Sequence, residues 1–304
     1  MEKKLNGKAI YSPKGKAGEY AKYAVNFYVG CSNDCTYCYC KRGILGHAMG
    51  APVAALKKCF KDETHARQTF EAELYKHLDE IRPHGLFFTF TSDPMLADTR
   101  TLTIQAVEIA LSYGVPCQIL TKRADFIDEL PDWWSQDTYR NKLAFGFTLT
   151  GHDELEPGAS TNAERIEAMK RLHAMGFKTF ASIEPVIDIE SSSKMIVQTL
   201  CHCDLYKIGL LSGKREYSKA DVTKFVLSTS YVVSRFILVH RPSVHPRLYF
   251  KDSAMEYIGY TRKELRESAL AFRDLIVEAD YNLFAKKEEP KPKQTIKPLK
   301  SDKK

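Results

Sequence analysis

The sequence lacks both a long apolar run and a secretory leader. A helix that crosses a membrane needs about 20 consecutive, mostly apolar residues, and this chain has no uninterrupted apolar stretch of about 18. The N-terminus carries lysines but no apolar region behind them, which a secretory signal would require. We therefore expect no membrane contact and a cytoplasmic location.

Cysteine is too sparse for a disulfide scaffold, with eight residues in a chain of 304. Folds that depend on disulfides are usually short, secreted and dense in cysteine. In a reducing compartment, clustered cysteines bind metals or carry out redox chemistry. Four of the eight, Cys31, Cys35, Cys38 and Cys40, lie within ten residues of one another, and this clustering needs a chemical explanation.

Net charge is low outside the C-terminal end of the chain. Of the total of +7, residues 286–304 contribute +5 from eight lysines and three acidic residues, which leaves +2 for the rest. We expect a single domain at 1–285 and a disordered lysine-rich tail at 286–304, because the tail has few apolar residues to bury. The tail is interpreted as a solubilising appendage or as a weak electrostatic handle for polyanions.

Short apolar strands alternate with amphipathic helices along the predicted domain. The predicted strands are 24–29, 86–91, 115–121, 143–149, 177–183 and 205–210, with a further apolar run at 236–239. The predicted helices are 63–81, 99–113, a short one before Pro131, one that Ser160 or Thr161 caps and Gly176 ends, and 261–280. This alternation is typical of parallel β-α units. It predicts an α/β fold that is either a full or partial (β/α) barrel or an open doubly wound sheet.

Polar residues at the ends of several strands favour the barrel. They are Thr91, Ser92 and Asp93, then Thr121 and Lys122, Thr148 and Thr150, and Glu184. A barrel collects its active site from the ends of several strands on one face, whereas an open sheet concentrates it at one switch point. We therefore predict a partial barrel with these residues around one site.

Cys31, Cys35 and Cys38 form a C-x3-C-x2-C pattern directly after the first predicted strand. Thiolates select zinc or iron–sulfur clusters. A structural zinc site normally takes four protein ligands, commonly as separated pairs, and the chain has no second C-x2-C pair. A four-iron cluster held by three cysteines leaves one iron open for catalysis, and Cys40 is then interpreted as a bystander.

The pattern C-x3-C-x2-C, with aromatic Tyr37 before its last cysteine, resembles the signature of the radical S-adenosylmethionine (SAM) superfamily. The resemblance implies that the three thiolates hold a [4Fe–4S] cluster whose free iron binds the amino and carboxylate groups of SAM. It implies that an electron from a donor such as a flavodoxin or ferredoxin cleaves SAM to methionine and a 5′-deoxyadenosyl radical, which abstracts a hydrogen atom from substrate. A full or partial barrel is also implied.

The chain also resembles, more narrowly, the spore photoproduct lyase-like or DNA-repair photolyase-like group. The motifs are residues 24–31 and 35–39, Thr91-Ser92-Asp93-Pro94, Leu120-Thr121-Lys122, Phe147-Thr148-Leu149-Thr150, Leu155-Glu156-Pro157 and Ser182-Ile183-Glu184-Pro185. Together they span about residues 10 to 215. The later motifs are short, and only their order makes them informative.

The resemblance implies roles for seven residues in binding SAM. Tyr37 would lie against the adenine, and Ser92 and Asp93 would contact the amino group or ribose. Lys122 would pair with the carboxylate through a charge-assisted bond. Thr148 or Thr150 would face the ribose, and Glu184 would point into the barrel mouth. The alternatives are ordinary: Ser92 and Asp93 could cap a turn, Lys122 could be a surface cation, and Glu184 could belong to a turn before Pro185.

Position 90 departs from the narrower group. Spore photoproduct lyases have a hydrogen-donating cysteine two residues before the serine of the Thr-Ser-Asp motif, where this chain has Phe90. Phenylalanine cannot donate a hydrogen atom in that way, so we do not expect repair of spore photoproduct by the family mechanism. The low charge outside the tail agrees, because duplex DNA binding relies on several phosphate contacts.

Three hypotheses about function follow from the sequence. The first is a radical SAM enzyme acting on an unidentified substrate, with no catalytic residue assigned. The second makes the substrate a nucleic acid, for lesion cleavage or modification. The cations that would assist binding are those of the tail and Lys14, Lys16, Lys41 and Arg42. The third is a non-enzymatic zinc or iron–sulfur protein. The sequence assigns no role to Cys117, Cys201 or Cys203.

Overall fold

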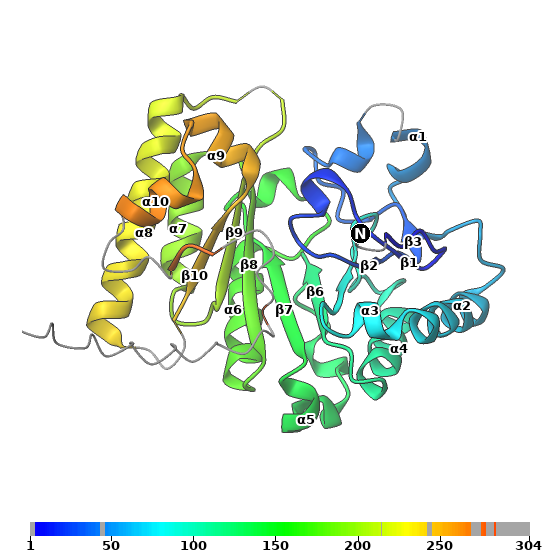
Figure 1. Ribbon diagram of the computed structural model, residues 1–304. Coiled ribbons are helices and arrows are strands. Elements are labelled where there is room, and N and C mark those ends of the chain that lie inside the picture. The colour runs from blue at the N-terminus through cyan, green and yellow to red at the C-terminus, as the bar shows by residue number, and fades with distance from the viewer. Residues whose placement is uncertain are drawn as a thin grey trace, which may run out of the picture.

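The computed structural model describes residues 4–42, 46–213, 215–241, 245–268, 275–277 and 283. The predicted tail at 286–304 and part of the helix predicted at 261–280 lie outside the described residues. Figure 1 shows a curved sheet with helices packed along it.

One sheet contains most of the strands, in the order β1-β2-β5-β6-β7-β8-β9-β10, and β3 pairs with β4 separately. Within the large sheet only β1 and β2 are antiparallel. The strands are β1 (Ile10–Tyr11), β2 (Ala24–Val25), β3 (Tyr28–Val29), β4 (Ala55–Leu56), β5 (Leu86–Phe88), β6 (Cys117–Thr121), β7 (Leu143–Thr148), β8 (Lys178–Val186), β9 (Leu205–Leu210) and β10 (Arg247–Phe250). A run of parallel neighbours requires a crossover between each pair, and the helices supply most of these crossovers.

The α-helices are α1 (Gly46–Met49), α2 (Glu63–Lys76), α3 (Leu78–Ile81), α4 (Arg100–Ser112), α5 (Asp137–Arg140), α6 (Asn162–Ala174), α7 (Ile189–Thr199), α8 (Lys219–His240), α9 (Asp252–Ile258) and α10 (Arg262–Ser268). The 3-10 helices are η1 (Gly15–Ala17), η2 (Tyr39–Lys41), η3 (Ile127–Glu129), η4 (Asp132–Ser135) and η5 (Asp153–Leu155).

Local sequence signals explain where several helices begin and end. Asp62 caps α2, because its carboxylate accepts the backbone N–H of His65 at 2.7 Å. Thr161 caps α6, and Glu164 completes a reciprocal capping box. The helix predicted at 63–81 is interrupted at His77, whose φ of −122° and ψ of 26° are not helical.

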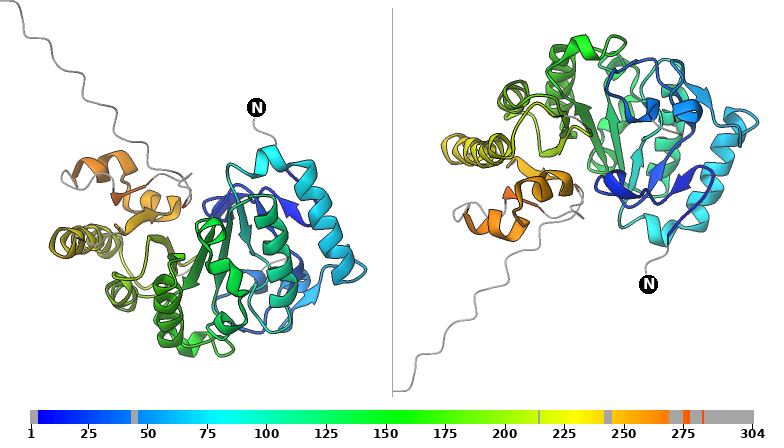
Figure 2. Two further views of the ribbon diagram at one scale, coloured as in Figure 1. Left: turned by 90° about the horizontal axis from the view of Figure 1, so that it is seen from below. Right: turned by 90° about the horizontal axis from the view of Figure 1, so that it is seen from above.

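The described strands form a partial barrel, as predicted, with β1 and β10 at the two edges of the sheet. The N-terminal segment bridges these edges. Glu19 accepts the hydroxyl of Tyr249 in β10 at 2.9 Å and the backbone N–H of Asp252 in α9 at 2.7 Å. Figure 2 shows the helices around the convex side of the sheet, with the dark-blue start of the chain near orange α9.

Apolar side chains fill both faces of the sheet. The larger cluster includes Phe145, Phe147 and Leu172 and joins the sheet to the helices. A smaller cluster on the other face contains Tyr20, Phe87, Phe180 and Tyr249, with Ala24, Ala144 and Leu205. Gly146 belongs to this concave face, where a β-carbon would lie 2.2 Å from the ring of Phe180. A close-packed barrel interior therefore requires glycine at this position.

Two further predictions from the sequence pattern were wrong. The strand predicted at 24–29 divides into β2 and β3, which belong to different sheets. The apolar run at 236–239 is the last turn of α8 and not a strand. Sequence reasoning also missed α7, α8 before its last turn, β10 and α9. β10 and α9 are short and give weak patterns, whereas α7 was missed although its buried residues recur on one face.

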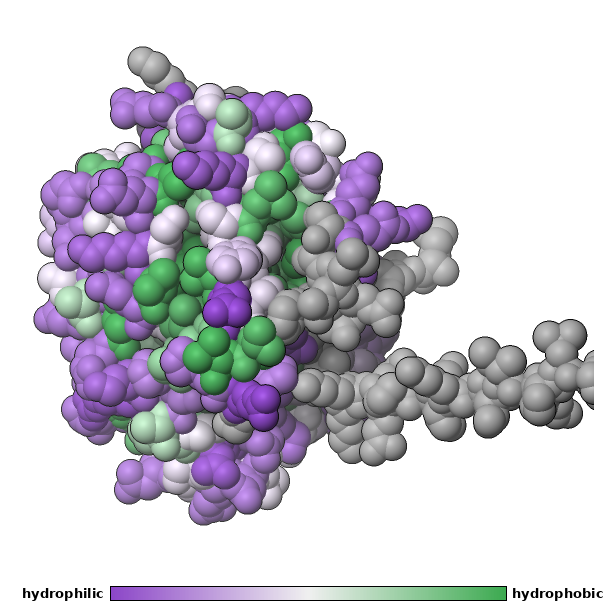
Figure 3. Space-filling model, turned by 90° about the vertical axis from the view of Figure 1, so that its left-hand side faces the viewer, coloured by the Kyte–Doolittle hydropathy of each residue, from purple (hydrophilic) through white to green (hydrophobic). Residues whose placement is uncertain are grey.

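Helix α8 is long and apolar enough to cross a membrane by length and composition, although half of its apolar stretch is buried inside the structure. This is weak evidence for a membrane span, because a core helix passes the same test. Figure 3 shows hydrophobic side chains among hydrophilic ones on the side of the molecule where α8 lies. Exposed apolar residues of α8 are Leu227, Tyr231, Leu238 and Val239.

Candidate active site

One cavity of about 500 Å³ lies at the carboxyl ends of the barrel strands. Its volume is typical of small-molecule sites. Segments following β5, β6, β9 and β10, the ends of β7 and β8, and the cysteine loop line it. The predicted site residues among its lining are Cys31, Cys35, Cys38, Tyr37, Ser92, Asp93, Lys122, Thr148 and Glu184. Thr150 is fully buried and is not part of the described lining; its hydroxyl oxygen accepts the backbone N–H of His152 at 3.3 Å instead.

The loop that carries the cysteines is fixed by backbone hydrogen bonds to distant segments. The N–H of Cys31 donates to Ala51 at 3.0 Å, and that of Thr36 donates to Leu155 at 3.0 Å. The N–H of Gly158 donates to Asn33 at 3.1 Å, and a β-carbon on Gly158 would lie 1.9 Å from the carbonyl oxygen of Ser32. The Leu155-Glu156-Pro157 motif and the glycine after it therefore form a support for the cysteine loop.

The environments of the three cysteines differ. Burial is the main cause that raises the pKa of Cys31 to about 12 and also raises that of Cys35. A hydrogen bond from Cys40 lowers the pKa of Cys38 below its usual range. Cys40 is buried and contacts the carbonyl oxygen of Phe90, with its sulfur 3.7 Å away.

Among the described residues, no three His, Cys, Asp or Glu side chains are arranged as ligands of a metal ion. Cysteines that hold an iron–sulfur cluster each bind a different iron, so their sulfur atoms need not converge on one point. Elsewhere, Cys117 and Cys203 are buried in the large apolar cluster, and Cys201 is exposed.

Asp93 joins three segments beneath the cavity. Its carboxylate accepts Asn33 at 2.7 Å from the cysteine loop, and Thr121 and the backbone N–H of Lys122 at 2.6 and 2.7 Å from the end of β6. It also accepts the backbone N–H of Met95 at 2.9 Å. These four bonds use the acceptor capacity of a carboxylate, so the geometry gives Asp93 an organising position.

Ser92 differs from its neighbour Asp93 in having no partner. Its hydroxyl oxygen is buried, lines the cavity, and has no hydrogen-bond partner within the described residues. A buried polar group without a partner costs about 1–3 kcal/mol. A ligand with a polar group in this part of the cavity would remove that cost.

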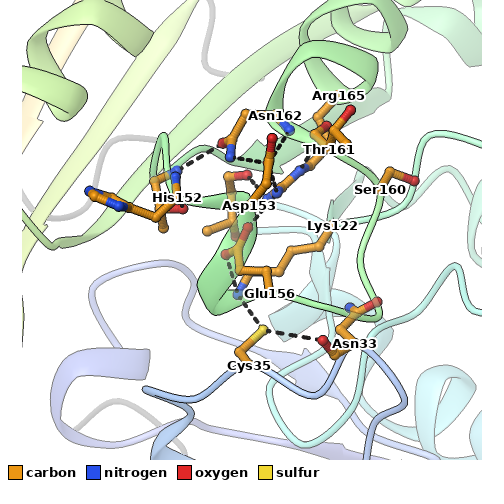
Figure 4. A network of polar contacts seen from close by, with 12 residues as sticks. Asn33, Cys35, Lys122, His152, Asp153, Glu156, Ser160, Thr161, Asn162 and Arg165 are labelled. Carbon is orange, nitrogen blue, oxygen red and sulfur yellow. Dashed lines mark hydrogen bonds and ion pairs between the residues drawn. The ribbon is translucent and has the colours of Figure 1, made fainter.

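Lys122 follows β6 and reaches the cysteine loop (Figure 4). Its Nζ lies 3.4 Å from Cys35 Sγ and 3.4 Å from a carboxylate oxygen of Glu156, over the ring of Tyr37 at 4.8 Å. Burial disfavours the charge, but Tyr37, Glu156 and Cys35 outweigh burial, and the pKa of Lys122 is raised above its usual range. Lys122 is thus a cation beside a cysteine sulfur.

Glu156 is fully buried beside two cations. It pairs with Lys122 and with Arg165 of α6, and it accepts the hydroxyl of Tyr37. Burial by itself would raise the pKa of Glu156, but Lys122 and Arg165 lower it below its usual range. Arg165 is also fully buried and donates to the carbonyl oxygen of Thr148 at 2.6 Å.

Another part of the cavity is built around Tyr20. The Tyr20 hydroxyl lies 2.6 Å from Ser182 Oγ and donates to Glu184 at 2.6 Å. Lys251 donates to the two oxygens of Glu184 at 3.0 and 2.9 Å and to the carbonyl oxygen of Lys16 at 2.8 Å. Glu184 lies at a register shift of β8, and such irregularities redirect side chains. We call Tyr20, Ser182, Glu184 and Lys251 the tyrosine side, and Cys31, Cys35, Cys38 and Lys122 the cysteine side.

Sequence reasoning missed Glu156, Tyr20 and Lys251 as parts of the site. Glu156 occurs in a motif that was noticed, but nothing in the sequence predicts its contact with Lys122. One signal was available in α6, where Arg165 lies on the apolar face with Ala168 and Met169. An arginine on such a face indicates a buried anionic partner.

No protein-family model and no curated protein matches the sequence. Solved structures do match. A cysteine-to-serine mutant of spore photoproduct lyase has a TM-score of 0.57 and 17% identity, covering 81% of this chain and 80% of that one. A tyrosine-to-phenylalanine mutant of the same enzyme has a TM-score of 0.56 and 16% identity, covering 79% and 80%.

A double mutant of spore photoproduct lyase with bound AdoMet and dinucleoside spore photoproduct has a TM-score of 0.51 and 16% identity. The match covers 71% of this chain but only 63% of that one, less than two thirds of its length. At these identities the likeness establishes the fold alone. The chain therefore has the partial-barrel fold of spore photoproduct lyase, and a partial barrel is what the sequence predicts.

Proposed function

We propose that this chain is a radical SAM enzyme. The observation that carries the proposal is that Cys31, Cys35 and Cys38, spaced as a three-thiolate motif, line one cavity with polar strand ends in this fold. A [4Fe–4S] cluster bound there would supply reductive cleavage of SAM to methionine and a 5′-deoxyadenosyl radical. Cys31, Cys35 and Cys38 would hold the cluster.

The residues around the cavity suit a SAM molecule. The unpartnered hydroxyl of Ser92 supports its predicted contact with the amino group or ribose. Lys122 lines the cavity and its pKa is raised above its usual range, so it offers a positive charge to the carboxylate. Tyr37 and Thr148 line the same space.

Anaerobic reconstitution with iron and sulfide tests the proposal. We expect about four irons per chain and release of 5′-deoxyadenosine when the reduced protein is mixed with SAM. A protein with a full cluster that never cleaves SAM would overturn the proposal. One zinc ion and no sulfide would favour the alternative, a non-enzymatic metal protein.

A nucleic-acid substrate is the second candidate, and one observation favours it. All four cations named from the sequence, Lys14, Lys16, Lys41 and Arg42, line the cavity. Lys41 pairs with Asp34, while the other three have no carboxylate partner within the described residues. Structures of spore photoproduct lyase hold a dinucleoside photoproduct. Phe90 lines the cavity as well, its ring stacked on Phe87 at 4.5 Å, so a hydrogen donor would have to come from another residue.

Binding of a labelled single-stranded oligonucleotide at several salt concentrations tests this second candidate. Replacing Lys14, Lys16 and Arg42 with glutamine should weaken binding and reduce the slope of affinity against salt by about one per lost phosphate contact. Lys263→Gln, an exposed lysine of α10, is the matched control. Salt-independent binding, or equal loss in the control, would count against a nucleic-acid substrate.

A further inference from the structure

Lys122 is held in place along its whole length. Its backbone N–H donates to Asp93 at 2.7 Å, and its carbonyl oxygen accepts the N–H of Ser160 at 3.1 Å. Its ammonium group then lies between Cys35 and Glu156, 3.4 Å from each. The side chain is only 16% exposed, so solvent screens its charge weakly.

Glu156 sets where that charge lies. The carboxylate is fully buried, and Arg165, which is also fully buried, holds it from the other side. Arg165 is in turn fixed by the carbonyl oxygens of Thr148 and Thr161, at 2.6 and 3.4 Å. A long lysine side chain has many rotamers, and this buried anion selects the one that points at the sulfur of Cys35.

We propose that Glu156 is a positioning residue that holds the Lys122 ammonium group against Cys35, where its charge favours the reduced iron–sulfur cluster. The inference rests on the proposed function. In the reduction, one electron passes from a low-potential donor (dithionite in the test, an iron–sulfur or flavin protein in the cell) to the cluster, and no bond forms or breaks. Hydrogen bonds and charge at a cluster sulfur tune its reduction potential.

A redox titration of the reconstituted cluster without SAM, followed by electron paramagnetic resonance, tests the role of Lys122. We expect Lys122→Met to make reduction about tenfold less favourable, a shift of about 59 mV to more negative potential for one electron. Lys122→Arg keeps the charge and should restore most of the shift. Lys122→Met leaves the Glu156–Arg165 pair intact, so the cavity wall keeps its buried ion pair.

Glu156→Gln separates positioning from simple charge. Loss of a nearby negative charge alone would make the potential less negative, whereas release of Lys122 from Cys35 makes it more negative, as we expect. Asp34→Asn, which removes a carboxylate from the cysteine loop without touching Lys122, is the control and should show no negative shift.

The outcomes that overturn each proposal differ. An unchanged potential in Lys122→Met, or a less negative one in Glu156→Gln, overturns this inference while leaving the proposed function standing. Failure of the unmodified protein to bind a four-iron cluster at all overturns the proposed function and, with it, this inference.

Discussion

The cysteine side and the tyrosine side of the cavity are built in different ways. Three of the four residues of the cysteine side come from a single loop, and Lys122 joins them from the end of β6. The tyrosine side brings Tyr20, Glu184 and Lys251 together from the N-terminal segment, β8 and the residue after β10. The cysteines of one side are therefore close together in the sequence, whereas the residues of the other side come together only when the barrel folds.

The two sides also differ in how completely their polar groups are paired. Near the cysteine side, the hydroxyl of Ser92 is buried with no partner among the described residues. On the tyrosine side, Tyr20, Glu184 and Lys251 satisfy one another through bonds of 2.6 to 3.0 Å. A buried hydroxyl without a partner gains a hydrogen bond when a polar ligand binds, whereas a network whose members are already paired stabilises the fold. The comparison predicts loss of chemistry on one side and loss of stability on the other.

Cys35→Ala should have the largest effect of any substitution in the cavity, and this effect falls on cluster binding and not on stability. We expect complete loss of the iron–sulfur absorbance and of 5′-deoxyadenosine formation, because two thiolates cannot replace three. Cys201→Ala, at an exposed cysteine, should keep both. Iron and sulfide analysis of the two proteins makes the measurement, and a full cluster in Cys35→Ala would contradict the assignment of the cysteine side.

The contrast explains what could be predicted from the sequence. Cys31, Cys35 and Cys38 could be predicted to share a site because their spacing is local, and Ser92, Lys122 and Thr148 because parallel strands bring their ends to one face. The structure places all six around one cavity. On the tyrosine side, Glu184 was predicted from its place at a strand end, but its contacts with Tyr20 and Lys251, more than two hundred positions apart in the chain, were not. Neither Tyr20 nor Lys251 lies in a periodic pattern, so only the folded barrel shows their contact.

The strands divide in the same way, into those that a local pattern predicts and those that depend on pairing with a distant strand. Strands such as β6 and β7 were predicted nearly in full, because turn residues bound continuous apolar runs there. β10 was missed because it is four residues long and its place beside β9 is set by pairing rather than by pattern. Lys251, which follows β10, was missed with it.

Lys251→Met should produce the largest loss of stability on the tyrosine side. Removing one member of a buried ion pair leaves Glu184 uncompensated and costs about 3 kcal/mol. Lys251 is 1% exposed, whereas Lys263, the control for Lys263→Met, is 85% exposed in its own pair with Glu267. Urea unfolding should show a large change in the first variant and little in the second.

The iron content of reconstituted Lys251→Met tests whether cluster binding on the cysteine side is independent of the tyrosine side. If the two sides are separate, the folded variant should still bind a full cluster. A variant that is normally stable, or one that is folded but free of iron, would show that the division between the sides is wrong.

Tyr20→Phe should have a smaller effect on the same side. The ring keeps its contacts with Phe87 at 5.4 Å and its place beneath the ammonium groups of Lys207 and Lys251. The hydroxyl contacts with Glu184 and Ser182 are lost, which costs about 1–2 kcal/mol. Thermal unfolding measures this change, and a loss as large as that of Lys251→Met would mean that the hydroxyl, and not the lysine, holds the tyrosine side together.

His152 lies between the segment that supports the cysteine loop and the residues after β8, and the effect of replacing it should be the smallest and depend on pH. One ring nitrogen faces the Asp188 carboxylate that caps α7 beyond β8, and the other lies 2.7 Å from Glu154 of η5, next to Glu156. Burial lowers the pKa of His152, but Glu154 and Asp188 outweigh burial and raise it. The stabilisation is therefore fully present below the unfolded pKa of about 6.5 and is lost as pH rises through the higher folded value.

At low pH, protonation of Glu154 and Asp188 removes the stabilisation that charged His152 provides. The pKa values of Glu154 and Asp188 are lowered, so their contribution is present above their unfolded values of about 4 and disappears as pH falls through the folded ones. The difference in unfolding free energy between the unmodified protein and His152→Gln should therefore be greatest at about pH 5 to 6.5 and shrink toward pH 9. His245→Gln, at an exposed histidine, is the control. A difference that stays constant across this range would mean that the charged His152 does not join the support of the cysteine loop to the residues after β8.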